Sequence, residues 1–76
     1  MTMRAIIIEI QEGSLLVFDT CMPQQVVVHT SNASNFCLGD HVLIHYSGAM
    51  TMSIPPQISA MRITRIPPYR NTNRCF

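Results

Sequence analysis

A glycine–aspartate turn leading into an alternating strand is the feature that most limits how this 76-residue chain can fold. Gly39 supplies a backbone that can adopt a positive φ, and Asp40 has a short side chain that can accept hydrogen bonds from nearby backbone amides. From His41 to Ser47 or Gly48, β-branched and polar residues then alternate with the period of two that a half-buried strand requires. The stretch therefore predicts a sharp corner between a loop and a strand.

The first part of the chain predicts a hairpin. Ile6, Ile8 and Ile10 recur at period two, which places them on one side of a half-buried strand over residues 5–12. Gly13 can adopt the positive φ that reverses a chain within a few residues. A second strand follows over 14–20, and its alternating Leu and Val residues suggest that both of its faces are partly covered.

Prolines and polar residues separate the remaining strands. Pro23 precedes a third strand over 24–30, and the polar run 31–35 predicts a loop with at most one helical turn. The two consecutive prolines at 55–56 cannot lie in a central strand, so they predict a bridging loop over 49–57. A fifth strand over 58–66 needs a bulge to reconcile its inward-facing residues.

Composition and the order of these runs indicate one all-β domain over residues 1–66. Hydrophobic residues make up 47% of the chain and charged residues only 12%, which excludes a disordered polymer. Five short strands without an amphipathic helix predict a small five-stranded antiparallel barrel. Residues 67–76 contain little apolar sequence, and we expect them to form a mobile tail.

At Gly39-Asp40-His41-Val42 the chain resembles OB-like barrels, which often enter a strand through such a turn. The run from Phe36 to Ile63, with Tyr46-Ser47-Gly48 and Ile54-Pro55-Pro56-Gln57-Ile58-Ser59-Ala60, resembles a family of small uncharacterised bacterial proteins with an OB-like fold. The resemblance covers roughly residues 4–66. It implies a barrel whose fifth strand lies between the third and the fourth.

Two features depart from that family. Some of its members look like exported proteins with an N-terminal leader, whereas we expect none here, because Glu9 interrupts the short apolar run near the start of the sequence. A full OB-fold usually places a helix between its third and fourth strands, whereas only residues 31–38 are available here. The resemblance therefore implies a truncated connection, and the ligand face of larger OB domains need not be preserved.

The sequence does not predict an enzyme, a cofactor or a metal site. No nucleophile, acid–base pair or phosphate-binding loop occurs at a workable spacing, and Asp40 has no visible catalytic partner. His41 and His45 share one strand face but lie about 13 Å apart, too far to bind one ion. His29 could approach His41 only if the third and fourth strands were neighbours.

The cysteines predict neither a disulfide framework nor a reactive site. Cys21, Cys37 and Cys75 form no CxxC pair, and an odd number cannot be fully paired within one chain. The first two have apolar neighbours and are expected to be core or loop residues. Because the chain shows neither a signal peptide nor an apolar run of membrane-spanning length, we expect a cytoplasmic protein.

An apolar loop is the best candidate for a contact site. Met50, Met52 and Ile54 follow Tyr46 closely, and methionine-rich surfaces adapt to their partners. Low charge also suggests that a second copy or another protein covers some apolar surface. We therefore expect a non-catalytic binding or protein-interaction module with these four residues at its rim. The alternative is that the loop only caps one end of the barrel.

A second hypothesis is single-stranded nucleic-acid binding. All five positive charges are arginines, and four of them fall in residues 41–76, whereas all four acids fall in residues 1–40. Arg62 and Arg65 on the fifth strand, with Tyr69 and Arg70 beyond it, form the only basic region with an aromatic residue nearby. OB barrels bind single strands through a basic groove and stacking aromatics, although a solvated basic face explains the same pattern.

Overall fold

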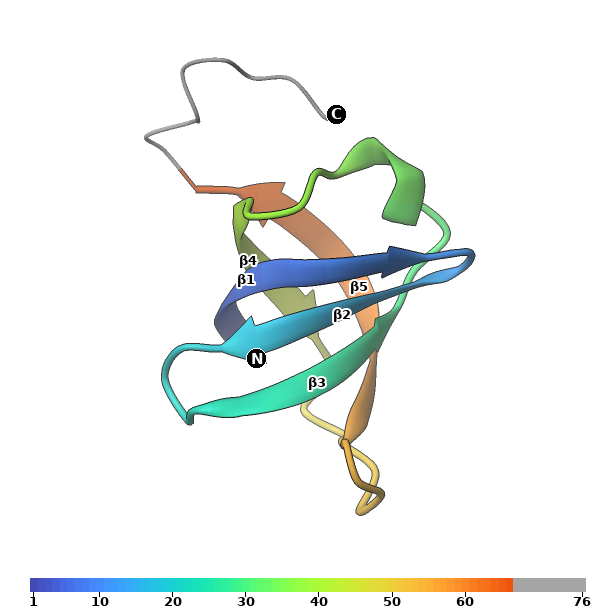
Figure 1. The fold of residues 1–76 in the computed structure, drawn as a ribbon. Helices are drawn as coiled ribbons and strands as arrows, with labels where there is room; N and C mark the ends of the chain where they lie inside the picture. Colours follow the sequence, from blue (N-terminus) through green and yellow to red (C-terminus); the bar gives the residue numbers. More distant parts are fainter. Residues whose placement is uncertain (67–76) are drawn as a thin grey trace.

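Five strands form a closed barrel in the computed structural model of this chain, which describes residues 1–66 (Figure 1). This confirms the predicted small all-β barrel. The expected tail over 67–76 lies outside the described residues. The strands are β1 (Thr2–Gln11), β2 (Ser14–Asp19), β3 (Gln24–His29), β4 (His41–Tyr46) and β5 (Gln57–Arg65), and one short 3-10 helix, η1, spans Ala33–Asn35.

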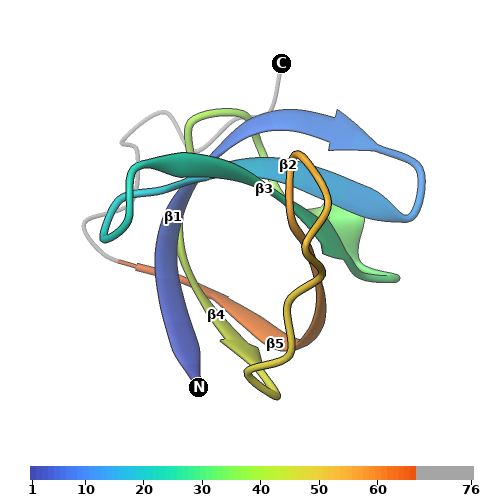
Figure 2. The same ribbon diagram turned by 90° about the horizontal axis from the view of Figure 1, so that it is seen from below.

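The strands follow the order β1-β2-β3-β5-β4 around the barrel, and β4 pairs with β1 to complete the ring (Figure 2). Strand β5 therefore lies between β3 and β4, as the resemblance to OB-like barrels implies. Four of the five pairings are antiparallel, whereas β3 and β5 run parallel. The sheet is thus mixed rather than purely antiparallel.

The core is built from side chains that alternate inward along each strand. On β3, Val26 and Val28 are fully buried while Val27 between them points outward and is half-buried. The same alternation on the other strands fills the barrel with aliphatic side chains, as expected for an interior of this size. The largest fully buried side chains are Ile7, Leu15, Val17, Val26, Val28, Val42 and Ile44.

Strand β1 differs from the prediction in which residues face the core. Ile6 and Ile8, which were expected to share a face with Ile10, point outward, whereas Ile7 is buried. The pairing with β2 shifts between Ile7 and Glu9, so Ile8 is an extra residue in a β-bulge. The bulge changes the parity of the strand, and Ile10 therefore packs against the core although Ile6 does not.

Strand β1 also begins earlier than the sequence indicated. Thr2 pairs with His45 and Met3 pairs with Ile44, so the first residues of β1 complete the sheet beside β4. Met3 is buried in the core. The segment before Ala5 is therefore part of the barrel wall.

The bulge that was expected in β5 is confirmed. Tyr46 pairs with Ala60 but His45 pairs with Arg62, which leaves Met61 as the extra residue. Met61 is exposed, while Ala60 and Ile63 on either side of it both pack against the core. Because Met61 is an extra residue, Ala60 and Ile63 can both face the core although they are an odd number of residues apart.

The connection between β3 and β4 is short, as the sequence implied. It contains only η1, whose Ala33 is buried against the core. Within residues 1–66, no helix has the length and apolar character needed to cross a membrane.

Candidate interaction site

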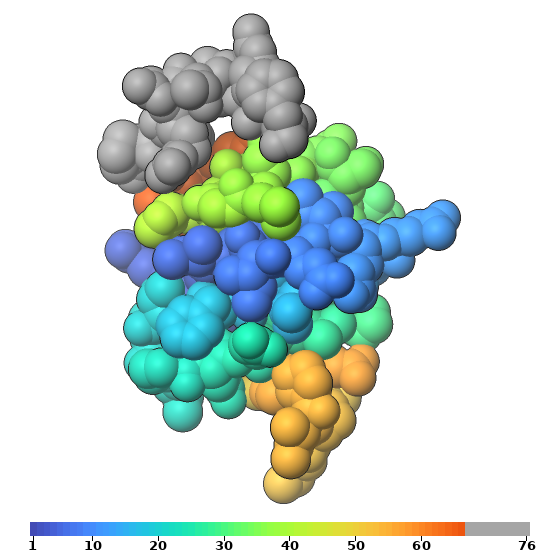
Figure 3. All heavy atoms as spheres, in the orientation of Figure 1, coloured from blue at the N-terminus to red at the C-terminus, as the bar shows by residue number. Residues whose placement is uncertain are grey.

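The loop 47–56 projects from one end of the barrel between β4 and β5 (Figure 3, yellow to orange). Its two legs are joined by hydrogen bonds between Thr51 and Gln57, the first residue of β5. The amide of Thr51 donates to the carbonyl of Gln57 at 3.0 Å, and the amide of Gln57 donates to Thr51 Oγ1 at 3.0 Å. These two bonds close the outer part of the loop, from Thr51 to Gln57.

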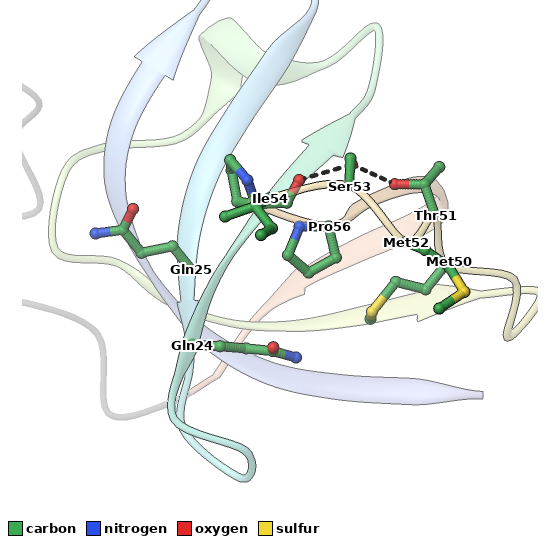
Figure 4. A pocket seen from close by; sticks show the side chains of 9 residues that line it. Gln24, Gln25, Met50, Thr51, Met52, Ser53, Ile54 and Pro56 are labelled. Carbon is green, nitrogen blue, oxygen red and sulfur yellow. Dashed lines mark hydrogen bonds between the residues drawn. The ribbon is translucent and has the colours of Figure 1, made fainter.

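The tip of the loop is held by hydroxyl groups rather than by the core (Figure 4). Ser53 Oγ donates to the carbonyl of Pro55 at 2.9 Å and lies 2.6 Å from Thr51 Oγ1. The peptide bond between Ile54 and Pro55 is cis. The hydroxyl hydrogen bonds give the loop a defined shape although most of its side chains are in water.

The four residues predicted at the rim occupy three different environments. Met52 and Ile54 are 97% and 98% exposed at the tip of the loop. Met50 is half-buried and packs against the core. Tyr46, with 7% exposure, belongs to the core itself. Met52 and Ile54 are therefore the members of this set that a partner can reach directly.

An open groove of about 620 Å³ lies between the loop and the start of β3. The loop contributes apolar and hydroxyl side chains, and β3 contributes two glutamines. In Figure 4, the side chain of Gln24 points toward the side of the groove on which Met52 lies. The lining residues are Gln24, Gln25, Met50, Thr51, Met52, Ser53, Ile54, Pro55 and Pro56.

The backbone of Gln25 forms an open edge beside this groove. Pairing between β3 and β5 begins at Val27 and Gln57, and the amide of Val27 donates to the carbonyl of Pro56 at 2.9 Å. Because successive residues of a strand point their backbone groups to opposite sides, Gln25 presents its N–H and C=O on the same side as Val27. Pro55 and Pro56 have no N–H to donate there, and no hydrogen bond to the Gln25 backbone on this side occurs among residues 1–66.

The glutamines were not among the predicted site residues. The sequence did hold a signal for them, because Pro55 and Pro56 precede β5 and cannot extend a ladder. Recognising that signal required knowing that β3 is the neighbour of β5, which only the fold shows.

The glycine–aspartate turn is structural. Gly39 has a φ of +85°, and the amide of Asp40 donates to the carbonyl of Cys37 at 3.1 Å, as in a tight turn with positive φ at its third residue. The Asp40 carboxylate accepts a hydrogen bond from the amide of Cys37 at 2.9 Å. The roles predicted for Gly39 and Asp40 are confirmed.

Arg65 completes this structural cluster. Its Nε forms an ion pair with Asp40 Oδ2 at 2.9 Å, its Nη2 donates to the carbonyl of Asn35 at 2.8 Å, and its guanidinium lies 5.6 Å from the centre of the Phe36 ring. Of the residues proposed for nucleic acid, Arg62 is exposed on β5, while Tyr69 and Arg70 lie outside the described residues. The nucleic-acid hypothesis stays a prediction, with Arg65 occupied by internal contacts.

The histidines are dispersed. Strand β5 separates His29 on β3 from His41 and His45 on β4, and His29 Nε2 lies 2.7 Å from Gln57 Oε1. Within the described part of the chain, no three His, Cys, Asp or Glu side chains lie close enough together to hold a metal ion. Cys21 is an exposed free thiol, whereas Cys37, for which no disulfide was expected, is disulfide-bonded.

Comparison of the chain with protein-family models, with curated proteins and with solved structures gave no match.

Proposed function

We propose that this barrel is a non-catalytic protein-binding module whose site is the loop 47–56 and the groove between that loop and β3. The observation that carries the proposal is the exposure of Met52 and Ile54, 97% and 98%, on a loop held in shape by its own hydrogen bonds. The proposal includes the OB-like assignment, which the position of β5 between β3 and β4 supports. A cytoplasmic location remains the prediction made from the sequence.

Burial of these two side chains supplies the driving force. Removing apolar surface from water stabilises a complex by about 25 cal/mol per Å². Met52 adds an unbranched, polarizable side chain that adapts to different partner surfaces. Because the loop is tied at Thr51 and Ser53 before binding, less conformational entropy is lost when a partner docks.

The open edge at Gln25 indicates the conformation of the bound segment. Its backbone N–H and C=O can pair with one residue of an extended peptide, which is how strand addition gives affinity without side-chain recognition. Alternate side chains of that peptide then face the groove beside Met52 and Ile54. We therefore expect the partner to present a short extended segment with apolar residues.

A displayed library of random eight-residue peptides, selected on the immobilised protein, tests the proposal. We expect enrichment of peptides with apolar residues at alternate positions. In nuclear magnetic resonance spectra, a synthetic enriched peptide should shift the amide signals of Gln25 and of residues 51–53. Replacing both exposed side chains, Met52→Ser with Ile54→Ser, should weaken binding at least tenfold.

Met61→Ser is the matched control, because Met61 is also exposed and apolar but lies in the β5 bulge outside the groove. Its affinity for the peptide should equal that of the wild type. Failure to enrich any peptide, or shifts confined to another part of the barrel, would rule out this site.

A further inference from the structure

A second apolar surface lies on the outside of the barrel, on strands that do not contribute to the loop. In the sequence, each of its residues on β2 and β3 alternates with a buried core residue, so their side chains point away from the interior. Ile8 and Phe18 are 41% and 37% exposed and the others are half-buried. This outer patch consists of Ile6, Ile8, Leu16, Phe18 and Val27.

The strand registers place these side chains next to one another. Ile6 pairs with Phe18, and Leu16 pairs with Val27 on its other side. Directly opposite residues of adjacent strands have side chains about 5 Å apart, so the patch is continuous across β1, β2 and β3. Figure 3 shows β1 and β2 at the front of the molecule, away from the projecting loop.

Charges of opposite sign stand at the two ends of the patch. Arg4 lies outward on β1 between the buried Met3 and Ala5, and Glu9 pairs with Leu16 beyond Ile8. Glu9 accepts one long hydrogen bond from Gln11 Nε2 at 3.3 Å. Within residues 1–66 neither Arg4 nor Glu9 forms an ion pair, since the single such pair found there joins Arg65 and Asp40.

We propose that the outer patch binds the same patch of a second copy of this chain. A two-fold axis that lies in the interface and crosses β1 reverses the direction of the facing β1. Arg4 of each copy then lies opposite Glu9 of the other, and the isoleucines and Phe18 meet between the two charge pairs. The arrangement satisfies both charges while covering the apolar surface.

Charge complementarity selects this arrangement. If the two β1 strands ran in the same direction, Arg4 would face Arg4 and Glu9 would face Glu9, and like charges across an interface are unfavourable. The antiparallel arrangement alone converts the unpaired charges at both ends into two intermolecular ion pairs. This proposal goes beyond the proposed function, because it uses a different surface, which shares only β3 with the groove, and a different partner.

Charge reversal tests the proposal by sedimentation equilibrium at several protein concentrations. The wild type should form a reversible dimer. Arg4→Glu and Glu9→Arg, measured separately, should each raise the dimer dissociation constant about tenfold or more, because each creates two like-charge contacts. An equimolar mixture of the two variants should form a heterodimer, since one copy then carries only acids and the other only arginines at these positions.

High salt gives a second readout, because it screens exposed charges. High salt should reduce the difference in dimer dissociation constant between the wild type and the charge variants. Arg62→Glu is the matched control, since it makes the same charge change on β5, which pairs with neither β1 nor β2, and it should dimerise like the wild type.

A wild type that is monomeric at all concentrations overturns the proposal. So does a mixture of the two variants that remains monomeric, or a dimer that only Met52→Ser with Ile54→Ser dissociates. That last result would leave the groove as the contact site and remove the outer patch.

Discussion

Arg65 Nε lies 2.9 Å from Asp40 Oδ2, so an ion pair joins the last residue of β5 to the turn that precedes β4. The same carboxylate oxygen accepts the amide of Cys37, and Arg65 also donates to the carbonyl of Asn35. One acid and one base therefore fix the position of the whole segment between η1 and β4. Arg65 is accordingly a stabilising residue of the fold.

Removing either partner should destabilise the barrel. Asp40→Ala leaves the amide of Cys37 and the guanidinium of Arg65 without their acceptor, and we expect the free energy of unfolding to fall by about 2–4 kcal/mol. Arg65→Ala should cost about 1–2 kcal/mol because its side chain is 40% exposed. Urea unfolding measures both values, and Arg62→Ala should stay within about 0.5 kcal/mol of the wild type. If the Asp40 and Arg65 effects are fully additive in the double variant, the two side chains are not coupled.

Gly39→Ala should destabilise the turn through backbone strain alone. A Cβ at this position meets no atom within 4 Å, so there is no clash, but the φ of +85° is unfavourable for an L-residue. We expect a loss of about 1–2 kcal/mol in thermal or urea unfolding. Gly39→Asn should lose less, because asparagine tolerates positive φ better. Equal stability of all three proteins would show that the positive φ is not required.

Met3→Ala tests whether the start of β1 belongs to the barrel wall. Met3 is 5% exposed within the core, and truncating a buried methionine costs about 2–5 kcal/mol. Thr2→Ala, at the exposed neighbouring position, should be close to neutral. Similar stability of both variants would mean that the strand begins after residue 3.

Stability and binding should separate at the projecting loop. Met52→Ser with Ile54→Ser should leave the free energy of unfolding within about 0.5 kcal/mol of the wild type, because both side chains are already in water. Ile44→Ala, in contrast, removes a fully buried side chain and should cost about 2–5 kcal/mol. A large loss of stability in the loop variant would show that the loop caps the barrel, which is the alternative that the sequence left open.

The five strands and their turns were predictable because their signals are local. Gly13, Gly39 and the proline pair 55–56 each act through their own backbone, and alternation along β3 and β4 reports which side chains face inward. The bulge in β5 was also predictable, since Ala60 and Ile63 both pack inward although their spacing is odd.

The orientation of β1 was not predictable in the same way. Ile6, Ile7, Ile8 and Ile10 fit either face of a strand by composition, and the bulge at Ile8 changes parity in the middle of the run. The stretch Ile6-Ile7-Ile8 contains no polar residue that would mark the outer face before Glu9, so the sequence does not show where such a bulge lies. The outer patch was missed for the same reason.

The candidate site was predicted in part. Alternation along β4 places Tyr46 on the same face as the buried Val42 and Ile44, so its burial had a local signal, whereas the exposure of Met52 depends on how the loop leaves the barrel. Arg65 reads as a free positive charge until β5 is placed beside the turn at Asp40, 25 residues away in the chain. Such contacts between distant residues carry no sequence signal of their own.

The parallel pairing between β3 and β5 has a consequence for how the barrel opens. It contains three registered pairs, from Val27 with Gln57 to His29 with Ser59, whereas β2 and β3 share six. Local unfolding starts where the fewest backbone hydrogen bonds must break, so amide hydrogens along this junction should exchange with solvent sooner than those between β2 and β3. A peptide bound at Gln25 lies beside the same junction and should slow that exchange. The exchange rate of the amides between β3 and β5 therefore reports what fraction of the protein has peptide bound.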